Sequence, residues 1–187
     1  RQPFAGSHDP LQLQKDPLTR VAPVVMYYFG SRRDAVAQAS EAARTTCQAP
    51  VVLAATAYFA ACLHGSLAGR ERQTLLAPAT GVWSARAPPR RLASILAGDY
   101  RSAISQQPGG AQDALGMLSQ ALDAFTSTGN FRDGALAAIN QGGDSDAVGA
   151  LYGQLAGAHY GINAIPVAWR NALIHKDLLA DHAERLL

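Results

Sequence analysis

The large apolar residues of this chain recur at helical spacing. Between residues 112 and 125 they follow one another at intervals of three and four positions: Leu115, Leu118, Leu122 and Phe125. This spacing places them on one face of an α-helix and predicts an amphipathic helix over 112–125. No segment of the sequence alternates apolar and polar residues convincingly with the period of two that is typical of a half-buried strand. We therefore expect an all-α fold.

A longer apolar run lies between residues 51 and 63. Every residue in it is apolar except Thr56, and Pro50 stands just before it, at a first-turn position that tolerates proline. The run has 13 residues. Because a helix that spans a membrane needs about 18 or more apolar residues, we expect a buried core helix that ends near Gly69, and no membrane partner.

Polar residues mark where further helices begin. Ser31, with Asp34 three positions later, is typical of an N-cap and predicts a helix from residue 32 to about residue 44. Asn130 likewise predicts a helix to about residue 140. Shorter helices are expected within 71–76, 90–97, 166–173 and 176–187, with irregular segments at 70–89 and 106–110. The pattern predicts one single-domain bundle of about eight to ten helices over residues 1–187.

Three glycines recur every four residues in the helix expected to end at Tyr160: Gly149, Gly153 and Gly157. Each interior glycine costs a helix up to about 1 kcal/mol relative to alanine. A stripe of three on one face is therefore unexpected unless another helix comes very close to it. We expect this helix to be central and tightly packed.

Composition and charge narrow the class of protein. Apolar types make up 48% of the residues and the net charge is +2, which excludes a disordered chain and gives no basic footprint for nucleic acid. The two cysteines, Cys47 and Cys62, make no disulfide framework, and we expect both to be buried. The sequence has no signal-peptide pattern, so we expect a cytoplasmic protein, and since it does not begin with Met we expect it to be cut from a longer product.

The segment Gly142-Gly143-Asp144-Ser145-Asp146 combines a flexible backbone with clustered carboxylates. Two carboxylates two residues apart, with a hydroxyl between them, offer hard oxygen ligands to Mg²⁺, Mn²⁺ or Ca²⁺. Acidic residues are also favoured at the beginning of a helix by its dipole, and Asp146 is a candidate for a plain N-cap. The residues by themselves leave the metal-binding and the capping interpretations open.

The same segment resembles the C-terminal signature of the ADP-ribosylglycohydrolase family, in which a Gly-Asp-x-Asp-Thr loop precedes a glycine-rich helix. Three further segments resemble family motifs in the correct order: Thr19-Arg-Val-Ala-Pro23 (Met-Arg-x-Ala-Pro), Arg44-Thr-Thr-Cys-Gln-Ala-Pro50 (Thr-His-x-x-Pro) and Ile165-Pro-Val-Ala-Trp169 (Ile-Pro-x-x-Trp). Together the four motifs cover nearly the whole chain.

The resemblance implies an all-helical fold of the ADP-ribosylglycohydrolase type with a binuclear Mg²⁺ or Mn²⁺ site. It also implies hydrolysis of the glycosidic bond between ADP-ribose and a modified side chain or a related conjugate, with ADP-ribose or an ADP-ribosylated protein as the partner. On this interpretation Asp144 and Asp146 are catalytic residues and metal ligands. Gly142, Gly143 and Ser145 would contact the substrate.

Five departures from the family pattern leave an alternative open, a catalytically degenerate relative that binds ADP-ribose or a protein partner without turnover. The Thr-Asp-Asp motif of the family's N-terminal half is absent, and the Thr after the second aspartate is Ala147. The other three departures are Gln14-Lys15-Asp16 at the family's Gly-Asn-Gly, Cys47 at the motif histidine, and Leu118–Asp123 without the glutamate and tryptophan of close relatives.

A third hypothesis is a purely structural helical module. The resemblance also implies that the N-terminal half of the family domain is missing here. A core divided in this way exposes apolar helix faces, which drive association. We therefore expect a homodimer, a pairing with the missing N-terminal half, or aggregation.

Overall fold

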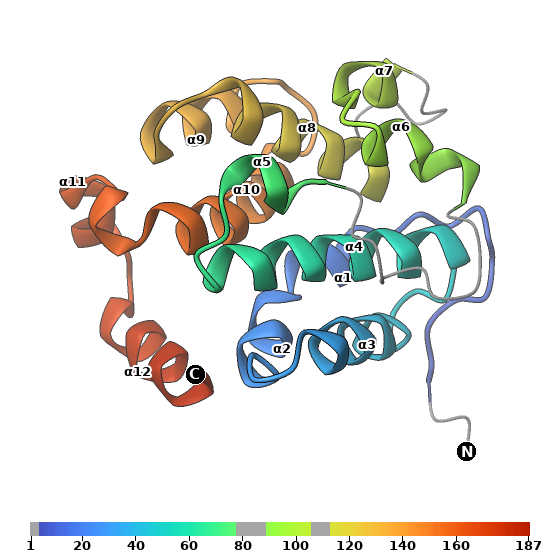
Figure 1. The fold of residues 1–187 in the computed structure, drawn as a ribbon, viewed down its shortest axis with the longest axis horizontal. Coiled ribbons are helices and arrows are strands. Elements are labelled where there is room, and N and C mark those ends of the chain that lie inside the picture. The colour runs from blue at the N-terminus through green and yellow to red at the C-terminus, as the bar shows by residue number, and fades with distance from the viewer. Residues whose placement is uncertain (1–3, 78–88, 106–112) are drawn as a thin grey trace.

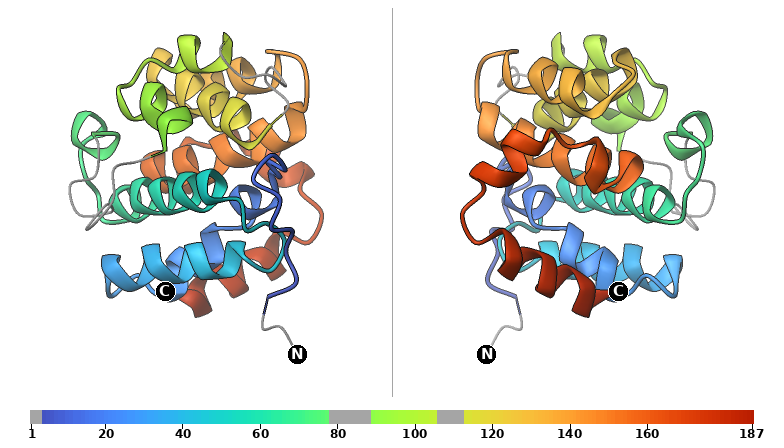
Figure 2. Two further views of the ribbon diagram at one scale, coloured as in Figure 1. Left: turned by 90° about the vertical axis from the view of Figure 1, so that its right-hand side faces the viewer. Right: turned by 90° about the vertical axis from the view of Figure 1, so that its left-hand side faces the viewer.

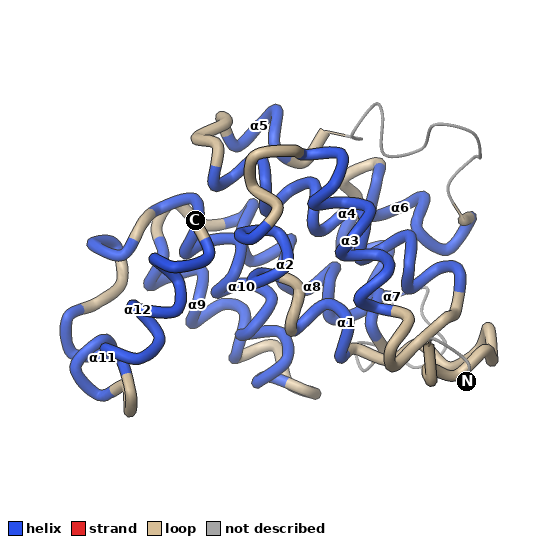
Figure 3. The backbone as a smooth tube through the Cα atoms, turned by 90° about the horizontal axis from the view of Figure 1, so that it is seen from below, coloured by secondary structure: helices blue, strands red, loops and turns tan. Residues whose placement is uncertain are grey.

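The computed structural model describes residues 4–77, 89–105 and 113–187, and within them the regular secondary structure is helical throughout (Figures 1 and 3). With η marking a 3₁₀ helix, the elements are α1 (Asp16–Thr19), α2 (Ala22–Tyr27), α3 (Arg32–Ala43), α4 (Pro50–Leu67), α5 (Arg72–Leu75), η1 (Arg90–Leu92), α6 (Ala93–Leu96), α7 (Tyr100–Ser105), α8 (Ala114–Ser127), α9 (Phe131–Ile139), α10 (Ser145–Tyr160), η3 (Ile162–Ala164), α11 (Val167–Ala172) and α12 (Lys176–Leu186). The all-α expectation is confirmed. The irregular segment expected at 106–110, and most of that at 70–89, lie outside the described residues.

Helix α4 runs through the middle of the protein, with α3 on one side and α8 and α9 on the other (Figures 1 and 2). Within the described chain it is the one helix whose length and composition would suit a membrane span, and 83% of it is buried by the surrounding helices. The core helix expected from residues 51–63 is therefore confirmed. It extends to Leu67, and Gly69 follows with a positive φ of 70°.

The caps predicted at Ser31 and Asn130 are confirmed. The Ser31 hydroxyl accepts a hydrogen bond from the backbone N–H of Asp34 at 3.3 Å, and the Asn130 side chain accepts one from that of Asp133 at 2.9 Å. These bonds satisfy donors that the first turn of a helix leaves unpaired. The four residues of the predicted amphipathic stripe on α8 are all fully buried: Leu115, Leu118, Leu122 and Phe125.

The interpretation of the glycine stripe was wrong for two of its three residues. A Cβ atom added to Gly149 would lie 3.1 Å from Cγ2 of Ile139, but one added to Gly153 or Gly157 would have nothing within 4 Å. Helix α10 buries the opposite face, which carries Val148, Leu151 and Leu155. No neighbouring helix in the described chain therefore makes the close approach that we expected at Gly153 and Gly157.

The C-terminal helices lie at the periphery of the protein. After α10 the chain leaves the body through η3 and α11, and α12 then lies against α2 (Figures 1 and 2). None of residues 161–187 is buried. Large apolar side chains are exposed along this segment: Ile162, Val167, Trp169, Leu173, Ile174, Leu178, Leu179 and Leu187.

Candidate functional site

The loop that carries the predicted site residues turns sharply just before α10. Gly142 and Gly143 both have positive φ values, 81° and 75°, a conformation that residues with a Cβ atom rarely adopt. The space where their Cβ atoms would lie is open. Two successive left-handed residues thus turn the chain so that Asp144 stands at the N-cap position and Ser145 begins the helix.

The structure does not support Asp146 as the N-cap. Asp146 lies inside α10, in its first turn, and the residue at the N-cap position, Asp144, makes no capping hydrogen bond with its side chain. Both carboxylates are nevertheless near the positive end of the helix dipole, which favours negative charge. The Asp146 side chain is exposed, whereas Asp144 and Ser145 are partly buried.

Asp144 forms an ion pair that links the loop before α10 to the N-terminal part of the chain. The ammonium group of Lys15, just before α1, donates a hydrogen bond to Oδ2 of Asp144. This bond is the largest influence on the pKa of Lys15, which is raised above its ordinary value. The pKa of Asp144 is lowered, chiefly by hydrogen bonding with the Asp146 side chain and next by Lys15. The two side chains are 36% and 25% exposed, so solvent still reaches the pair.

The donors in this loop are of the kind that Mg²⁺ and Mn²⁺ take. Asp144 and Asp146 provide hard carboxylate oxygens, and Ser145 lies between them. Among the described residues, no group of three or more His, Cys, Asp or Glu side chains could hold a metal ion. The pair therefore fits as part of the ligand set of a divalent cation and does not complete one.

Arg20, in the Thr19–Pro23 motif, connects α1 to the end of α3. Its Nη2 atom donates to the backbone carbonyl of Ala42 at 3.2 Å and to the hydroxyl oxygens of Thr45 and Thr46 at 2.8 and 2.9 Å. The Thr19–Pro23 and Arg44–Pro50 motifs are therefore in direct contact. Sequence reasoning placed both motifs but did not assign this role to Arg20.

Gln154 connects α10 to the same region. Its side-chain oxygen accepts a hydrogen bond from the backbone N–H of Ala22 at 2.9 Å, and its Nε2 atom donates to the carbonyl of Leu18 at 3.1 Å. The glycine-rich helix α10 and the Thr19–Pro23 motif are thus held together through one side chain. The sequence places Lys15 where the family has Gly-Asn-Gly, but the contact of Lys15 with Asp144 and the contacts of Gln154 were not predicted, because no local pattern marks a long-range contact.

Among the described residues, no hydrogen bond or ion pair joins the remaining motif positions, in segments 44–50 and 165–169, to residues 142–146, here called the acidic loop. The Ile165–Trp169 segment runs from the residue after η3 into α11 at the periphery, and only Ile165 packs partly against the core. Cys47 is fully buried and its Sγ donates to the carbonyl of Gln12. Burial raises the pKa of the Cys62 thiol to about 12. The expectation that both cysteines are buried is confirmed.

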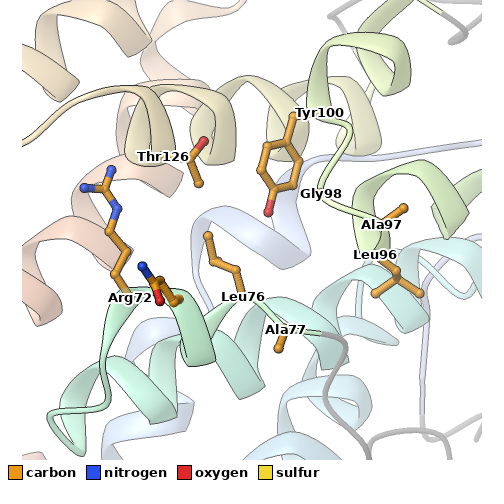
Figure 4. Close-up of a pocket in the computed structure, with 9 residues that line it drawn as sticks. Arg72, Leu76, Ala77, Leu96, Ala97, Gly98, Tyr100 and Thr126 are labelled. Atoms are coloured by element: carbon orange, nitrogen blue, oxygen red, sulfur yellow. The ribbon is translucent and has the colours of Figure 1, made fainter.

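A separate pocket of about 580 Å³ opens between α5, α6, α7 and α8 (Figure 4). Arg72, Leu76, Tyr100 and Thr126 are among the residues that line it. The Arg72 guanidinium lies over the ring of Phe125, 4.9 Å from its centre, and Nη2 donates to the carbonyl of Thr128 at 2.6 Å. No residue of the acidic loop lines this pocket, so it is distinct from the predicted site.

The chain is similar in sequence and in fold to proteins that hydrolyse ADP-ribose linkages by name. A sequence model of the ADP-ribosylglycohydrolase family matches residues 2–187. The ADP-ribosylarginine hydrolases Tri1 of Pseudomonas putida and of Serratia proteamaculans are 31% and 28% identical to the chain over 98% and 97% of its length, but the match covers 47% and 48% of theirs. A solved structure described as an ADP-ribosylglycohydrolase-related protein complex superposes with a TM-score of 0.84 at 38% identity, over 95% of this chain and 61% of that one. The chain thus spans about half the length of the curated relatives it matches.

Proposed function

The chain belongs to the ADP-ribosylglycohydrolase family, and from this we propose that it carries part of a site that removes ADP-ribose from a modified side chain. The resemblance found in the four sequence motifs is thereby confirmed at the level of the family and of the fold. The observation that carries the proposal is the acidic loop at the beginning of α10, where Asp144, at the N-cap position, and Asp146, in the first turn, both lie at the positive end of a helix.

We propose a divalent metal, Mg²⁺ or Mn²⁺, as the cofactor, with Asp144 and Asp146 among its ligands. When bound, such a metal supplies positive charge that holds ribose hydroxyls and activates a water molecule. The exposed carboxylate of Asp146 is suited to take a proton from the attacking water as positive charge develops at the anomeric carbon. The backbone of Gly142 and Gly143 and the side chain of Ser145 are suited to contact the sugar, because the loop is open on that side.

ADP-ribosylarginine is the first substrate to test, since both Tri1 relatives are named for its hydrolysis. We would titrate ADP-ribose into the chain by calorimetry with and without Mg²⁺, and follow release of ADP-ribose from an ADP-ribosylarginine peptide. We expect metal-dependent binding that Asp146→Asn abolishes and that Asp34→Asn, an exposed acid on α3, leaves intact. Binding without release would favour the alternative, a degenerate relative, and no binding would contradict a usable site in this chain.

We also propose that a further polypeptide segment covers α10. Asp146, Ala150, Gly153 and Gly157 follow one another at intervals of four, three and four and so share one face of the helix. Asp146 and Ala150 are exposed, and the glycines face open space. Small residues allow another helix to approach closely. Glycine also lowers the stability of a helix, and no contact within the described chain compensates for this at Gly153 and Gly157.

Part of each Tri1 protein has no equivalent in the matched region. We propose that a segment equivalent to that part, on the same polypeptide or on another, covers α10. The match accounts for less than half of each Tri1 protein, and the exposed apolar side chains of η3 and α11 continue directly from α10. To test whether such a segment binds, the chain is mixed with the unmatched part of P. putida Tri1, and the mass of the product is measured by light scattering after size exclusion. We expect a 1:1 complex that Gly153→Leu weakens and Ala37→Leu, an exposed site on α3, does not. A homodimer disrupted by Gly153→Leu would identify a second copy as the occupant, and a monomer that binds nothing would contradict the proposal.

A further inference from the structure

Lys15 brings a positive charge into the acidic loop from a distant part of the sequence. It is one of two lysines in the chain, and it lies 129 positions before Asp144 in the sequence. Its ammonium group contacts Oδ2 of Asp144 directly, and the carboxylates of Asp146 and Asp16 are close enough to add to the negative potential around it. The loop therefore already holds one cation, which belongs to the protein itself.

The Lys15 ammonium group and a divalent metal ion would compete for the same carboxylate in this loop. Both need the Asp144 oxygen atom, and a +1 charge within contact distance repels an incoming +2 charge. The Lys15 side chain is 36% exposed on a flexible four-carbon stem, so it can turn into solvent when it is displaced. Displacing Lys15 breaks its ion pair with Asp144. The free energy lost with that pair lowers the affinity of the loop for the metal.

We propose that Lys15 is a built-in competitor of the divalent metal at Asp144, so that the metal binds only when the Lys15 ammonium leaves the loop. This inference rests on the metal site of the proposed function and adds the residue that sets its affinity. It predicts that the site fills only at raised metal concentration, and that removing one positive charge at position 15 tightens the binding of metal.

The experiment measures Mn²⁺ binding by electron paramagnetic resonance of the unbound ion, without any assay of activity. It compares wild type with Lys15→Gln, and with Lys176→Gln, which makes the same chemical change at the other lysine, on α12. Lys15→Arg keeps the charge, and the double variant Lys15→Gln with Asp144→Asn tests whether the added affinity arises at Asp144. Circular dichroism checks that each variant is folded.

We expect Lys15→Gln to lower the dissociation constant of Mn²⁺ roughly tenfold or more, with Lys15→Arg and Lys176→Gln close to wild type and the gain lost in the double variant. Equal binding by wild type and folded Lys15→Gln would overturn this inference while leaving the proposed metal site in place. Absence of Mn²⁺ binding in both would overturn the metal dependence of the proposed function together with the inference.

Discussion

The side-chain oxygen of Gln154 accepts a hydrogen bond from the backbone N–H of Ala22, 132 residues away in the sequence, at 2.9 Å. The Nε2 atom of the same side chain donates to the carbonyl groups of Leu18 and Thr19. One amide therefore pairs backbone groups at the end of α1 and the beginning of α2, and fixes both against α10.

Replacing Gln154 by alanine should destabilise the protein by roughly 1–2 kcal/mol, because the partly buried backbone groups of Leu18 and Ala22 lose their partners. Urea unfolding measures the free energy of unfolding. Gln38→Ala, at an exposed position of α3, is the matched control and should change it by less than about 0.5 kcal/mol. Equal effects of the two substitutions would show that the bridge adds nothing to stability.

Gly134→Ala should be more damaging than an average glycine substitution. A Cβ atom at this position would lie well under 3 Å from the Tyr152 hydroxyl group, which donates a hydrogen bond to the carbonyl of Phe131 at 3.0 Å. The expected cost is about 1–3 kcal/mol, since α9 must move away from α10. Thermal and urea unfolding measure it, with Gly129→Ala as the control because the space there is open. Tyr152→Phe in the Gly134→Ala background should recover part of the loss, since it removes the nearest atom.

Gly153→Ala should stabilise the isolated chain by up to about 1 kcal/mol, because alanine has the higher helix propensity and its methyl group meets no atom within 4 Å. A rise in the midpoint of thermal unfolding measures the effect. If the proposed segment packs on this face, the same methyl group should weaken its association. A fall in stability of the isolated chain would instead show that the face is already occupied.

Stability should rise with pH across the range just below pH 6.5, in part because of His159. Burial, and next the positive charge of Arg72, lower the pKa of His159 below its ordinary value of 6.5. Its ring packs on those of Phe125 and Tyr160, at 5.3 and 4.9 Å between centres. The unfolded chain binds the proton more readily, so the stabilisation is present above pH 6.5 and is lost as the pH falls toward the folded-state pKa.

His159→Phe should remove this part of the pH dependence, as measured by urea unfolding at a series of pH values between 4.5 and 7.5, a range chosen to bracket the ordinary pKa of histidine of about 6.5. His182→Phe, on the exposed helix α12, should retain it. An unchanged slope in His159→Phe would assign the pH dependence to other groups.

Much of the helical architecture was predictable because its signals are local. The caps at Ser31 and Asn130, the apolar run after Pro50 and the stripe that ends at Phe125 each depend on residues within a few turns of one another. Helix α7, Tyr100–Ser105, was not predicted, although a local signal precedes it: the Asp99 side chain accepts a hydrogen bond from the backbone N–H of Ser102 at 3.2 Å, as an N-cap does. The glycine stripe on α10 was correctly placed on one helix face, but the described chain provides a close neighbour only at Gly149.

The sequence by itself determined where most helices begin and end, which family the motifs resemble, and that two carboxylates lie in a glycine-containing loop. Only the tertiary structure decided that Lys15 pairs with Asp144, that Gln154 holds Ala22, and that the face of α10 bearing Gly153 lies open. Periodicity and capping are short-range effects, and they specify each helix separately. The contacts between residues 129 and 132 positions apart depend on how the helices pack, which no single segment encodes.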